Sequence, residues 1–331
     1  MRRHPLLEKE RIDLPLRLNA FPTMEVLLRN IFTAGALAVS AIASVAVLPS
    51  SATAQETEYA IQEIGGGLYR WTAGPYHSVY LVHDDGIAVA DPLSSDAASW
   101  LRAELARRYP DKPITHVIYS HSHPDHAYGG EALDDGGTIF IAHEQAAETW
   151  KLNRAKVRMP DVTFYDRLTV TLPGAGDIRL AYWGANNGKG SVSMLFPQQD
   201  ALHVVDWIVV GRLPYQTLDG YDINGMISST RAILSDASET EFSTFIGGHA
   251  DIGTRDDIEF YLSYLEALHD GVLEGILAGD TLDTIQRSID LSRWSRLKRF
   301  DAWRNANIEG VYNQLIDDYY VTMRPEVPAP D

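Results

Sequence analysis

The sequence predicts a mixed α/β sandwich with helices on its outside, and two observations support this fold class. Strand-like segments dominate the chain just after residue 55, strands and helices then mix, and helices dominate the end. Hydrophobic residues make up 45% and charged residues 22% of the 331 residues, which is the balance of a globular protein with a deep core. The chain contains no cysteine, so disulfides, thiolate nucleophiles and thiolate metal sites are all excluded.

Residues 1–54 differ from the rest of the chain and are predicted to be a signal peptide. An Ala- and Val-rich apolar run at residues 31–48 follows a basic residue and precedes a small-residue Ala-Thr-Ala pattern that ends at Ala54. A membrane anchor is the alternative, because the run has about the minimum length that spans a bilayer. A start of translation at Met24 would give the leader a more usual length, so a misannotated start codon is a further alternative. We therefore expect residues 55–331 to form the folded domain and to be periplasmic or secreted.

The first part of that domain is expected to alternate strands with turns around one helix. Residues 59–91 alternate in polarity and are broken by Gly- and Asp-rich turns, which predicts several antiparallel strands. Residues 94–109 are predicted to be a helix, because Ser94 or Ser95 can cap it and apolar residues recur at helical spacing. A short apolar strand is expected at residues 114–119.

The remainder is expected to mix strands with helices and to end in helices. The predicted strands share short apolar runs bounded by turn residues, at 138–142, 168–172, 178–183, 191–196, 201–205 and 245–246. The predicted helices share longer runs with helical periodicity, at 143–152, 223–234, 256–277 and most of the chain to about residue 320.

Residues 120–130 carry the clearest chemical signal and follow directly on an apolar strand. They read Ser-His-Ser-His-Pro-Asp-His-Ala-Tyr-Gly-Gly. Residues two apart in an extended segment point the same way, so His121 and His123 can bind one ion. Asp125 and His126 follow a turn that proline restricts, and they can face a second metal position. The pattern therefore predicts a metal-binding loop at the end of a strand.

The His-Ser-His-Pro-Asp-His run resembles the HxHxDH signature of the metallo-β-lactamase-fold hydrolases. The segment Gly-Ile-Ala-Val-Ala-Asp-Pro that ends at Pro92 is similar to that family's early strand ending in aspartate. The resemblance covers about residues 59–252. It implies an αββα four-layer sandwich, here with extra C-terminal helices, and one or two zinc ions at the edge of the sheets.

The resemblance also implies ligands further along the chain. Asp206 follows a predicted strand and resembles the family's bridging aspartate, and His249 after Gly-Gly resembles the histidine of the second metal position. The alternatives are an ordinary strand-terminal aspartate and a buried structural histidine. Asp91 could hydrogen-bond a ligand histidine or cap the next helix. Because the chain lacks cysteine, the second position must use Asp206, unlike that of many true zinc β-lactamases.

The third motif histidine of the family is absent. Counting back from the proline that ends the next strand puts Asn187 at its place, and no histidine lies between His143 and His203. His203 is expected on the strand face opposite to the bridging aspartate, and His143 is expected to open a helix. Asn187 is then at most a weak oxygen ligand, and Asn186 could exchange roles with it. Lys189 and Asn186 could bind a substrate anion or lie in an exposed turn.

The expected metal positions are therefore unequal. The ligands expected at the first position are His121, His123 and, weakly, Asn187. Those expected at the second are Asp125, His126 and His249, with Asp206 able to help. Zinc takes three or four protein ligands, so the second position should bind zinc more tightly. With one ion bound, His121 or His123 is free to act as a general base, and Asp125 can hold the metal and accept a proton.

These features predict an exported zinc hydrolase that acts on an ester, lactone, amide or related bond. β-Lactamase-like and lactonase-like activities belong to that range. The formal net charge of −17 argues against a nucleic-acid substrate and favours a small molecule. The alternatives are a metal- or ligand-binding protein without turnover and an iron-containing oxidoreductase of the same fold, which depends on the missing histidine. No stable membrane span is expected after cleavage of the leader, and a homo-oligomer is compatible with the sequence.

Overall fold

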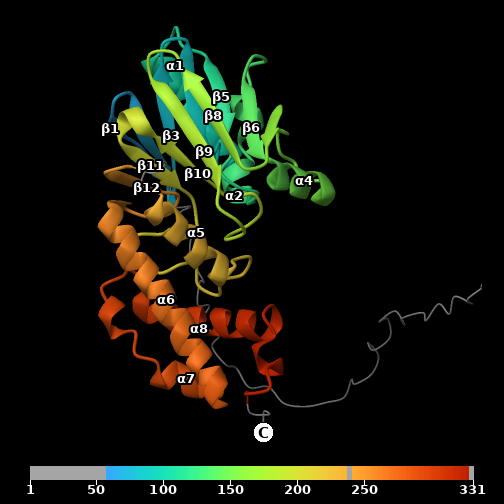
Figure 1. The fold of residues 1–331 in the computed structure, drawn as a ribbon. Helices are drawn as coiled ribbons and strands as arrows, with labels where there is room; N and C mark the ends of the chain where they lie inside the picture. The colour runs from blue at the N-terminus through green and yellow to red at the C-terminus, as the bar shows by residue number, and fades with distance from the viewer. Residues whose placement is uncertain (1–56, 237–240, 328–331) are drawn as a thin grey trace, which may run out of the picture. The chain divides into compact units, whose positions relative to one another are not determined.

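Two β-sheets lie face to face in the part of the chain that the structure describes, residues 57–236 and 241–327 (Figure 1). In this computed structural model the predicted signal peptide at residues 1–54 lies outside the described residues. Within the described ranges, no helix combines the length and the apolar character needed to cross a bilayer.

The first sheet has seven strands that neighbour one another in sequence order. They are β1 (Tyr59–Gly65), β2 (Leu68–Ala73), β3 (Tyr76–His83), β4 (Gly86–Ala90), β5 (Ile114–Ile118), β6 (Ile139–His143) and β7 (Val162–Phe164). Strands β1 to β4 pair antiparallel, as the alternating sequence predicts, and β4 to β7 pair in parallel.

The second sheet has six strands in the order β13-β12-β11-β10-β9-β8. They are β8 (Arg167–Leu172), β9 (Gly176–Tyr182), β10 (Val192–Phe196), β11 (Ala201–Val204), β12 (Thr244–Gly247) and β13 (Ile252–Gly253). Strands β11 and β12 are parallel, and the other pairs are antiparallel. The sequence analysis missed β7 and β13, because edge strands of three and two residues are too short to show a period.

The described α-helices follow the predicted pattern, except for the four-residue helices Pro124–Ala127 and Gly130–Leu133, which the sequence analysis missed. They are α1 (Ser95–Arg108), α2 (Pro124–Ala127), α3 (Gly130–Leu133), α4 (Glu144–Asn153), α5 (Ile223–Ser235), α6 (Arg255–Ala278), α7 (Leu282–Ser288) and α8 (Phe300–Asp317). Ser94 caps α1 by accepting a hydrogen bond from the Ala97 amide, at 3.2 Å. A capping box of Thr254 and Asp257 begins α6.

The apolar residues form three layers of core, which confirms the predicted αββα sandwich. Leu81 of the first sheet and Met194 of the second belong to the core between the sheets. Val89 of β4 lies on the other side of the first sheet and packs in one cluster with Leu101 of α1. Phe245 of the second sheet packs in another cluster with residues of α5, α6 and α8. Helices α7 and α8 extend this last layer, as the predicted extra C-terminal helices.

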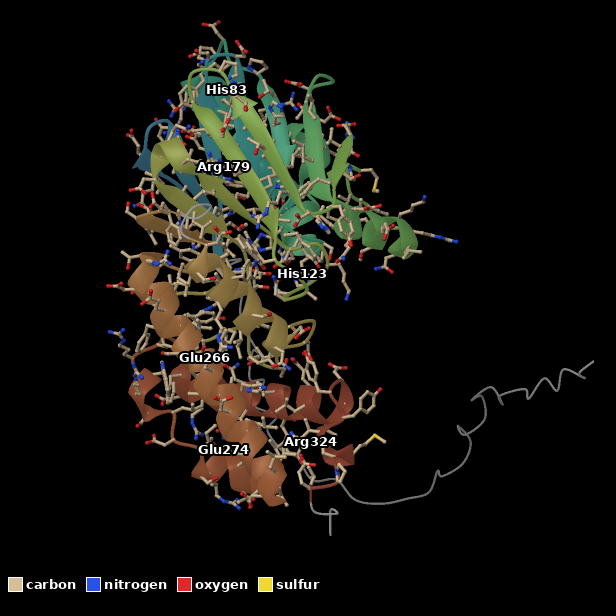
Figure 2. The ribbon with its side chains drawn as sticks, in the orientation of Figure 1. His83, His123, Arg179, Glu266, Glu274 and Arg324 are labelled. Carbon is tan, nitrogen blue, oxygen red and sulfur yellow. The ribbon has the colours of Figure 1, made fainter. Side chains whose placement is uncertain are left out.

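Parallel strands end together at one edge of this sandwich. The chain leaves β4 and β5 of the first sheet, and β11 and β12 of the second, close to the predicted ligands. Figure 2 shows His123 at the end of the sheets nearest to α5, while His83 lies at the opposite end. The topology therefore gathers side chains that are far apart in sequence at one place.

Substitution of Phe196 provides a test of the core between the sheets. Its side chain is buried in the cluster that joins the two sheets, so Phe196→Ala should lower the free energy of unfolding by about 3–5 kcal/mol. Urea unfolding followed by circular dichroism measures this change. Tyr165→Ala removes an aromatic ring that is 73% exposed and should have little effect. Equal effects of the two changes would contradict the assignment of the inter-sheet core.

Candidate metal centre

The loop after β5 divides the motif side chains between two directions. His123 stands at the N-cap of α2, and Pro124 occupies its first turn, where a missing N–H costs nothing. His121 and His123 precede the helix, His123 in extended backbone, whereas Asp125 and His126 lie on the helix. The change from strand-like to helical backbone turns neighbouring residues into two separate sets of ligands.

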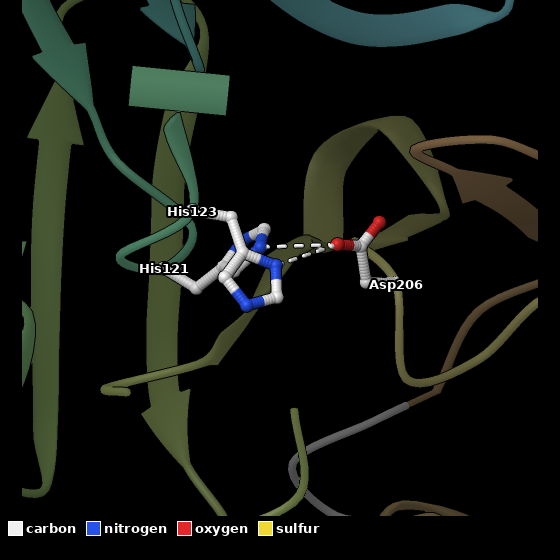
Figure 3. Close-up of side chains that lie close together, drawn as sticks. All are labelled: His121, His123 and Asp206. Atoms are coloured by element: carbon white, nitrogen blue, oxygen red, sulfur yellow. Dashed lines mark hydrogen bonds and ion pairs between the residues drawn. The ribbon is translucent and has the colours of Figure 1, made fainter. Parts of the chain in front are cut away.

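His121, His123 and Asp206 form the first ligand group (Figure 3). The Asp206 Oδ2 atom lies 3.1 Å from His121 Nε2 and 3.3 Å from His123 Nδ1. One ligand atom from each residue lies within 4.8 Å of the others, which is close enough for a single ion. The sequence analysis expected only the two histidines and a weak amide here, so the structure adds a carboxylate to this group.

Asp125, His126 and His249 form the second ligand group, as the sequence analysis expected. The two imidazole Nε2 atoms are 3.1 Å apart, and Asp125 Oδ2 lies 3.8 Å from the His126 nitrogen and 3.7 Å from the His249 nitrogen. The Asp206 Oδ1 atom lies 3.1 Å from His249 Nε2 and 3.6 Å from His126 Nε2. Asp206 therefore stands between the two groups with one oxygen toward each.

Asp206 combines full burial with a strained backbone. It follows β11 with a φ of 69°, in the left-handed region that few residues other than glycine adopt. Burial alone would raise the pKa of its carboxyl group, but the imidazoles of His126 and His121 hold it well below the usual value. The aspartate is therefore an anion that needs cationic neighbours.

His126 supplies part of that positive charge. Burial opposes its protonation, but Asp206 and Asp91 outweigh burial and raise the pKa of His126 to about 9. Without a metal ion, the centre is thus held together by buried ion pairs. A divalent cation can replace the protons, because metal binding requires neutral imidazoles.

Partners outside the centre orient three of the four imidazoles. His121 Nδ1 lies 2.8 Å from Ser120 Oγ, His126 Nδ1 lies 3.3 Å from Asp91 Oδ2, and His249 Nδ1 lies 3.1 Å from the Pro75 carbonyl oxygen. This leaves Nε2 of each ring to face the centre, as in metal-binding histidines. His121 Nε2 and Asp206 Oδ1 make the ion-pair contacts given above but no hydrogen bond in the described structure. The donor set therefore fits a divalent metal ion.

Asp91 lies behind both ligand groups, at the place expected of a residue that orients a ligand histidine. Its carboxylate accepts hydrogen bonds from the Ser120 amide at 2.7 Å and from Ser120 Oγ at 2.5 Å. Its Oδ2 also contacts His126. Asp91 is fully buried. Burial alone would raise the pKa of its carboxyl group, but contact with His126 outweighs burial and lowers this pKa.

Asn187 has a fully buried side chain, and neither its amide nitrogen nor its amide oxygen has a hydrogen-bond partner among the described residues. The next residue, Gly188, touches the first ligand group, since a Cβ there would lie 3.0 Å from both His121 Cδ2 and His123 Nε2. Asn186 instead donates to Ser229 Oγ at 3.2 Å. Of the two, Asn187 thus has the free amide, and its role as a weak ligand stays a prediction.

The other candidate residues have structural or peripheral places. His203 bonds the Ile246 carbonyl oxygen at 2.9 Å, and His143 caps α4, both away from the ligand groups as expected. Lys189 is exposed and binds Ser122 through its backbone. Tyr76, at the start of β3, is a neighbour of the centre, and its ring packs edge-on against His249 at 5.1 Å.

Asp91→Asn should weaken metal binding by about 10- to 100-fold. An amide nitrogen facing His126 Nδ1 would donate a hydrogen bond, which shifts the imidazole proton to Nε2 and blocks that ligand atom. Zinc titration against a chromophoric chelator measures the change. Asp161→Asn is the matched control, because Asp161 accepts the Phe140 amide at 2.9 Å and contacts no ligand histidine. Unchanged affinity in Asp91→Asn would contradict the orienting role.

Comparison with known proteins relates this centre to a family. Residues 71–240 match the family model of the metallo-beta-lactamase superfamily. The chain is 25% identical over 249 residues to the 2,4-dinitroanisole O-demethylase subunit alpha of Nocardioides sp. (strain JS1661), covering 74% of this chain and 71% of that protein.

Two solved structures show the same fold at low identity. The metallo-beta-lactamase from Pontibacter korlensis has a TM-score of 0.55 and 18% identity, covering 63% of this chain and 99% of its own. The inverting sec-alkylsulfatase Pisa1 from Pseudomonas sp. has a TM-score of 0.64 and 17% identity over 82% of this chain, which spans 52% of the sulfatase. Because the family model matches more than half of its residues, the chain belongs to the metallo-beta-lactamase superfamily.

Proposed function

We propose that this chain is an exported zinc-dependent hydrolase that cleaves an ester, lactone, amide or related bond of a small molecule. The observation that carries the proposal is the pair of ligand groups that share the Asp206 carboxylate. When bound, zinc supplies a nucleophile from water at neutral pH and polarises the oxygen of the bond to be cleaved. Superfamily membership supports this reaction class, and the leader-like residues 1–54 support export.

The residues of this chain have distinct tasks in such a reaction. Asp125, His126, His249 and one oxygen of Asp206 would hold zinc at the second group, which offers four donors. When the first group carries no ion, His123 can accept the proton that the attacking water releases, because its side chain is 30% exposed and contacts Asp206.

A cleft beside the second ligand group has room for a small molecule. Its volume is about 630 Å³, and its lining includes Asp125, Tyr76, Tyr59 and Leu93. A mixed lining of aromatic, apolar and a few polar groups is typical of small-molecule sites. The cleft supports a small-molecule substrate that reaches the centre from the side of Asp125.

Carbon–oxygen bonds are the second, narrower candidate for the bond that is cleaved. The relative in Nocardioides is named an O-demethylase and the sulfatase an alkylsulfatase, and both names denote removal of a group at oxygen. This favours ester, sulfate-ester and ether bonds over the amide of a β-lactam. Ligand binding without turnover and iron-dependent oxidoreductase chemistry are the alternatives, and the asparagine at position 187 keeps the first of these open.

The two ligand groups should differ in zinc affinity. Zinc titration of the purified protein should show one tight ion, because the second group has four donors and the first has three. Asn187→His should raise the zinc affinity of the first group by about tenfold or more, since an imidazole is a better zinc ligand than an amide. Asn186→His, with its side chain directed to Ser229, is the control. Two equally tight ions in the wild type would contradict this ordering.

Hydrolysis should depend on the second ligand group. Zinc-loaded protein should hydrolyse at least one member of a panel of aryl esters, lactones, alkyl sulfates, 2,4-dinitroanisole and β-lactams. His126→Ala should lower kcat by about 100-fold or more, because it removes a buried ligand. His269→Ala, a histidine paired with Asp270 on α6, should leave activity unchanged. No turnover by the wild type on any member would favour the binding-protein alternative.

A further inference from the structure

Helix α8 carries two buried amide side chains and a glycine at helical spacing, namely Asn307, Gly310 and Gln314. The side chain of Asn307 is fully buried and that of Gln314 is 9% exposed, although their neighbour Val311 packs in an apolar cluster. Residues three, four and seven apart share one face of a helix. Burying an amide costs free energy unless hydrogen bonds compensate it, so the bonds made from this face indicate what it does.

Asn307 holds the beginning of the segment 214–223, which lies between the bridging aspartate and α5 in sequence. Its amide nitrogen donates to the carbonyl oxygens of Gln216 at 2.8 Å and Pro214 at 3.2 Å. Its amide oxygen accepts a hydrogen bond from the Tyr264 hydroxyl of α6 at 2.8 Å. Both donors and the acceptor of this side chain are therefore used, and the bond to α6 fixes the orientation of the amide.

Gln314 holds the other end of the same segment. Its amide nitrogen donates to the Leu218 carbonyl oxygen at 3.3 Å, and its amide oxygen accepts from the Ile223 amide at 2.9 Å. Ile223 begins α5, so Gln314 also pairs one of the amides that a helix leaves free at its start. Between the two amides, Gly310 allows a close approach, because a Cβ there would overlap the Thr217 carbonyl oxygen.

The backbone of the segment depends on this support. Leu218 has a φ of 57°, in the left-handed region that few residues other than glycine adopt. Such a conformation persists only where the surrounding structure enforces it. Here the bond from Gln314 to the Leu218 carbonyl and the burial of the Leu218 side chain enforce it. Loss of the bond would therefore allow the segment to relax.

The same segment contacts the first ligand group. A Cβ on Gly220 would lie 3.8 Å from His123 Nε2. The Gly220 carbonyl accepts the Gly188 amide at 3.1 Å, and Tyr221 pairs through its backbone with Asn187. Gly188 in turn packs against the His123 ring, since a Cβ there would lie 3.0 Å from Nε2. Contacts therefore continue from α8 through this segment to a ligand of the first group.

Packing of the helical layer alone does not account for two amides on this face. Ile308 and Leu315 of α8 pack in the same layer through apolar side chains. Replacing buried hydrogen-bonding groups by apolar groups of the same shape can be nearly neutral for stability, so stability alone does not favour Asn307 and Gln314. Fully paired amides instead fix one backbone arrangement. The family model ends at residue 240, so this support comes from outside the matched part of the chain.

We propose that Asn307 and Gln314 are positioning residues for the first ligand group, which they support by holding residues 214–223 against it. They act through the contacts of Gly220 and Tyr221, described above, and not by touching the ion. Without them the segment relaxes, the His123 ring loses a neighbour, and the first group binds zinc more weakly. The second group, whose rings are oriented by other partners, keeps its affinity. The inference rests on the proposed function only in taking zinc as the ion.

Zinc titration of the full chain tests this role without any turnover. Gln314→Met and Asn307→Leu keep the approximate volume of each side chain and remove its hydrogen bonds. Each should weaken binding of the first-group ion by about tenfold and leave the tighter ion unchanged. Ile285→Ala is the control, because it removes a buried side chain that packs on Gly275 in the same helical layer. It should lower the thermal midpoint without changing either zinc affinity.

A wild type that binds a single ion is tested in a second background. Asn187→His adds an imidazole on the loop that the segment supports, so Gln314→Met should remove about tenfold of the affinity that Asn187→His adds. Histidine NMR of the zinc-loaded protein provides a measurement that needs no first-group ion. The His123 signal, identified by its loss in His123→Ala, should shift in Gln314→Met and stay in place in Ile285→Ala.

An unchanged first-group affinity and an unmoved His123 signal in Gln314→Met would overturn the proposal, as would equal changes in Ile285→Ala. If Gln314→Met fails to fold, Gln314→Glu keeps the acceptor for the Ile223 amide and loses only the donor to Leu218. It should still weaken the first-group ion or shift the His123 signal, and wild-type behaviour would then overturn the proposal. Failure of the hydrolase proposal would appear separately, as inactivity on the substrate panel.

Discussion

The Asp206 carboxylate lies among four imidazole rings, and the arrangement of the whole centre depends on it. One oxygen approaches His121 and His123, and the other approaches His126 and His249. A buried carboxylate is stable only when cations or hydrogen-bond donors surround it. Because these four histidines come from loops of both sheets, the charge of one side chain ties the two halves of the sandwich together at this edge.

The rigidity of the centre comes from contacts behind the ligands. Asp91 binds both the amide and the hydroxyl of Ser120, and through that residue and His126 it fixes rings in both ligand groups. Two buried residues with positive φ, Asp91 at 32° and Asp206 at 69°, mark where the chain turns away from β4 and β11. Such backbone strain persists where surrounding structure enforces it, and here the enforcing contacts are the same ones that orient the ligands.

The sequence predicts this centre only where the information is local. The spacing of His121, His123, Asp125 and His126 is enough to predict two sets of ligands, because strand and turn geometry act over a few residues. The bridging role of Asp206 follows only from the resemblance to a family, since the geometry that permits it depends on φ after β11 and on the approach of the second sheet. The choice between Asn186 and Asn187 likewise needed Ser229, which is 43 residues away.

A local cation also resolves how so acidic a chain could receive a charged substrate. With a formal net charge of −17, the chain as a whole repels anions. At physiological ionic strength, however, that repulsion fades over about 8 Å of solvent. A partly buried cation is screened much less, so within the centre its attraction outweighs the distant surface charges. Metal ions that neutralise the carboxylates of the ligand groups would make the centre positive within a negative protein. The acidic surface would therefore not prevent a charged substrate from binding at the centre.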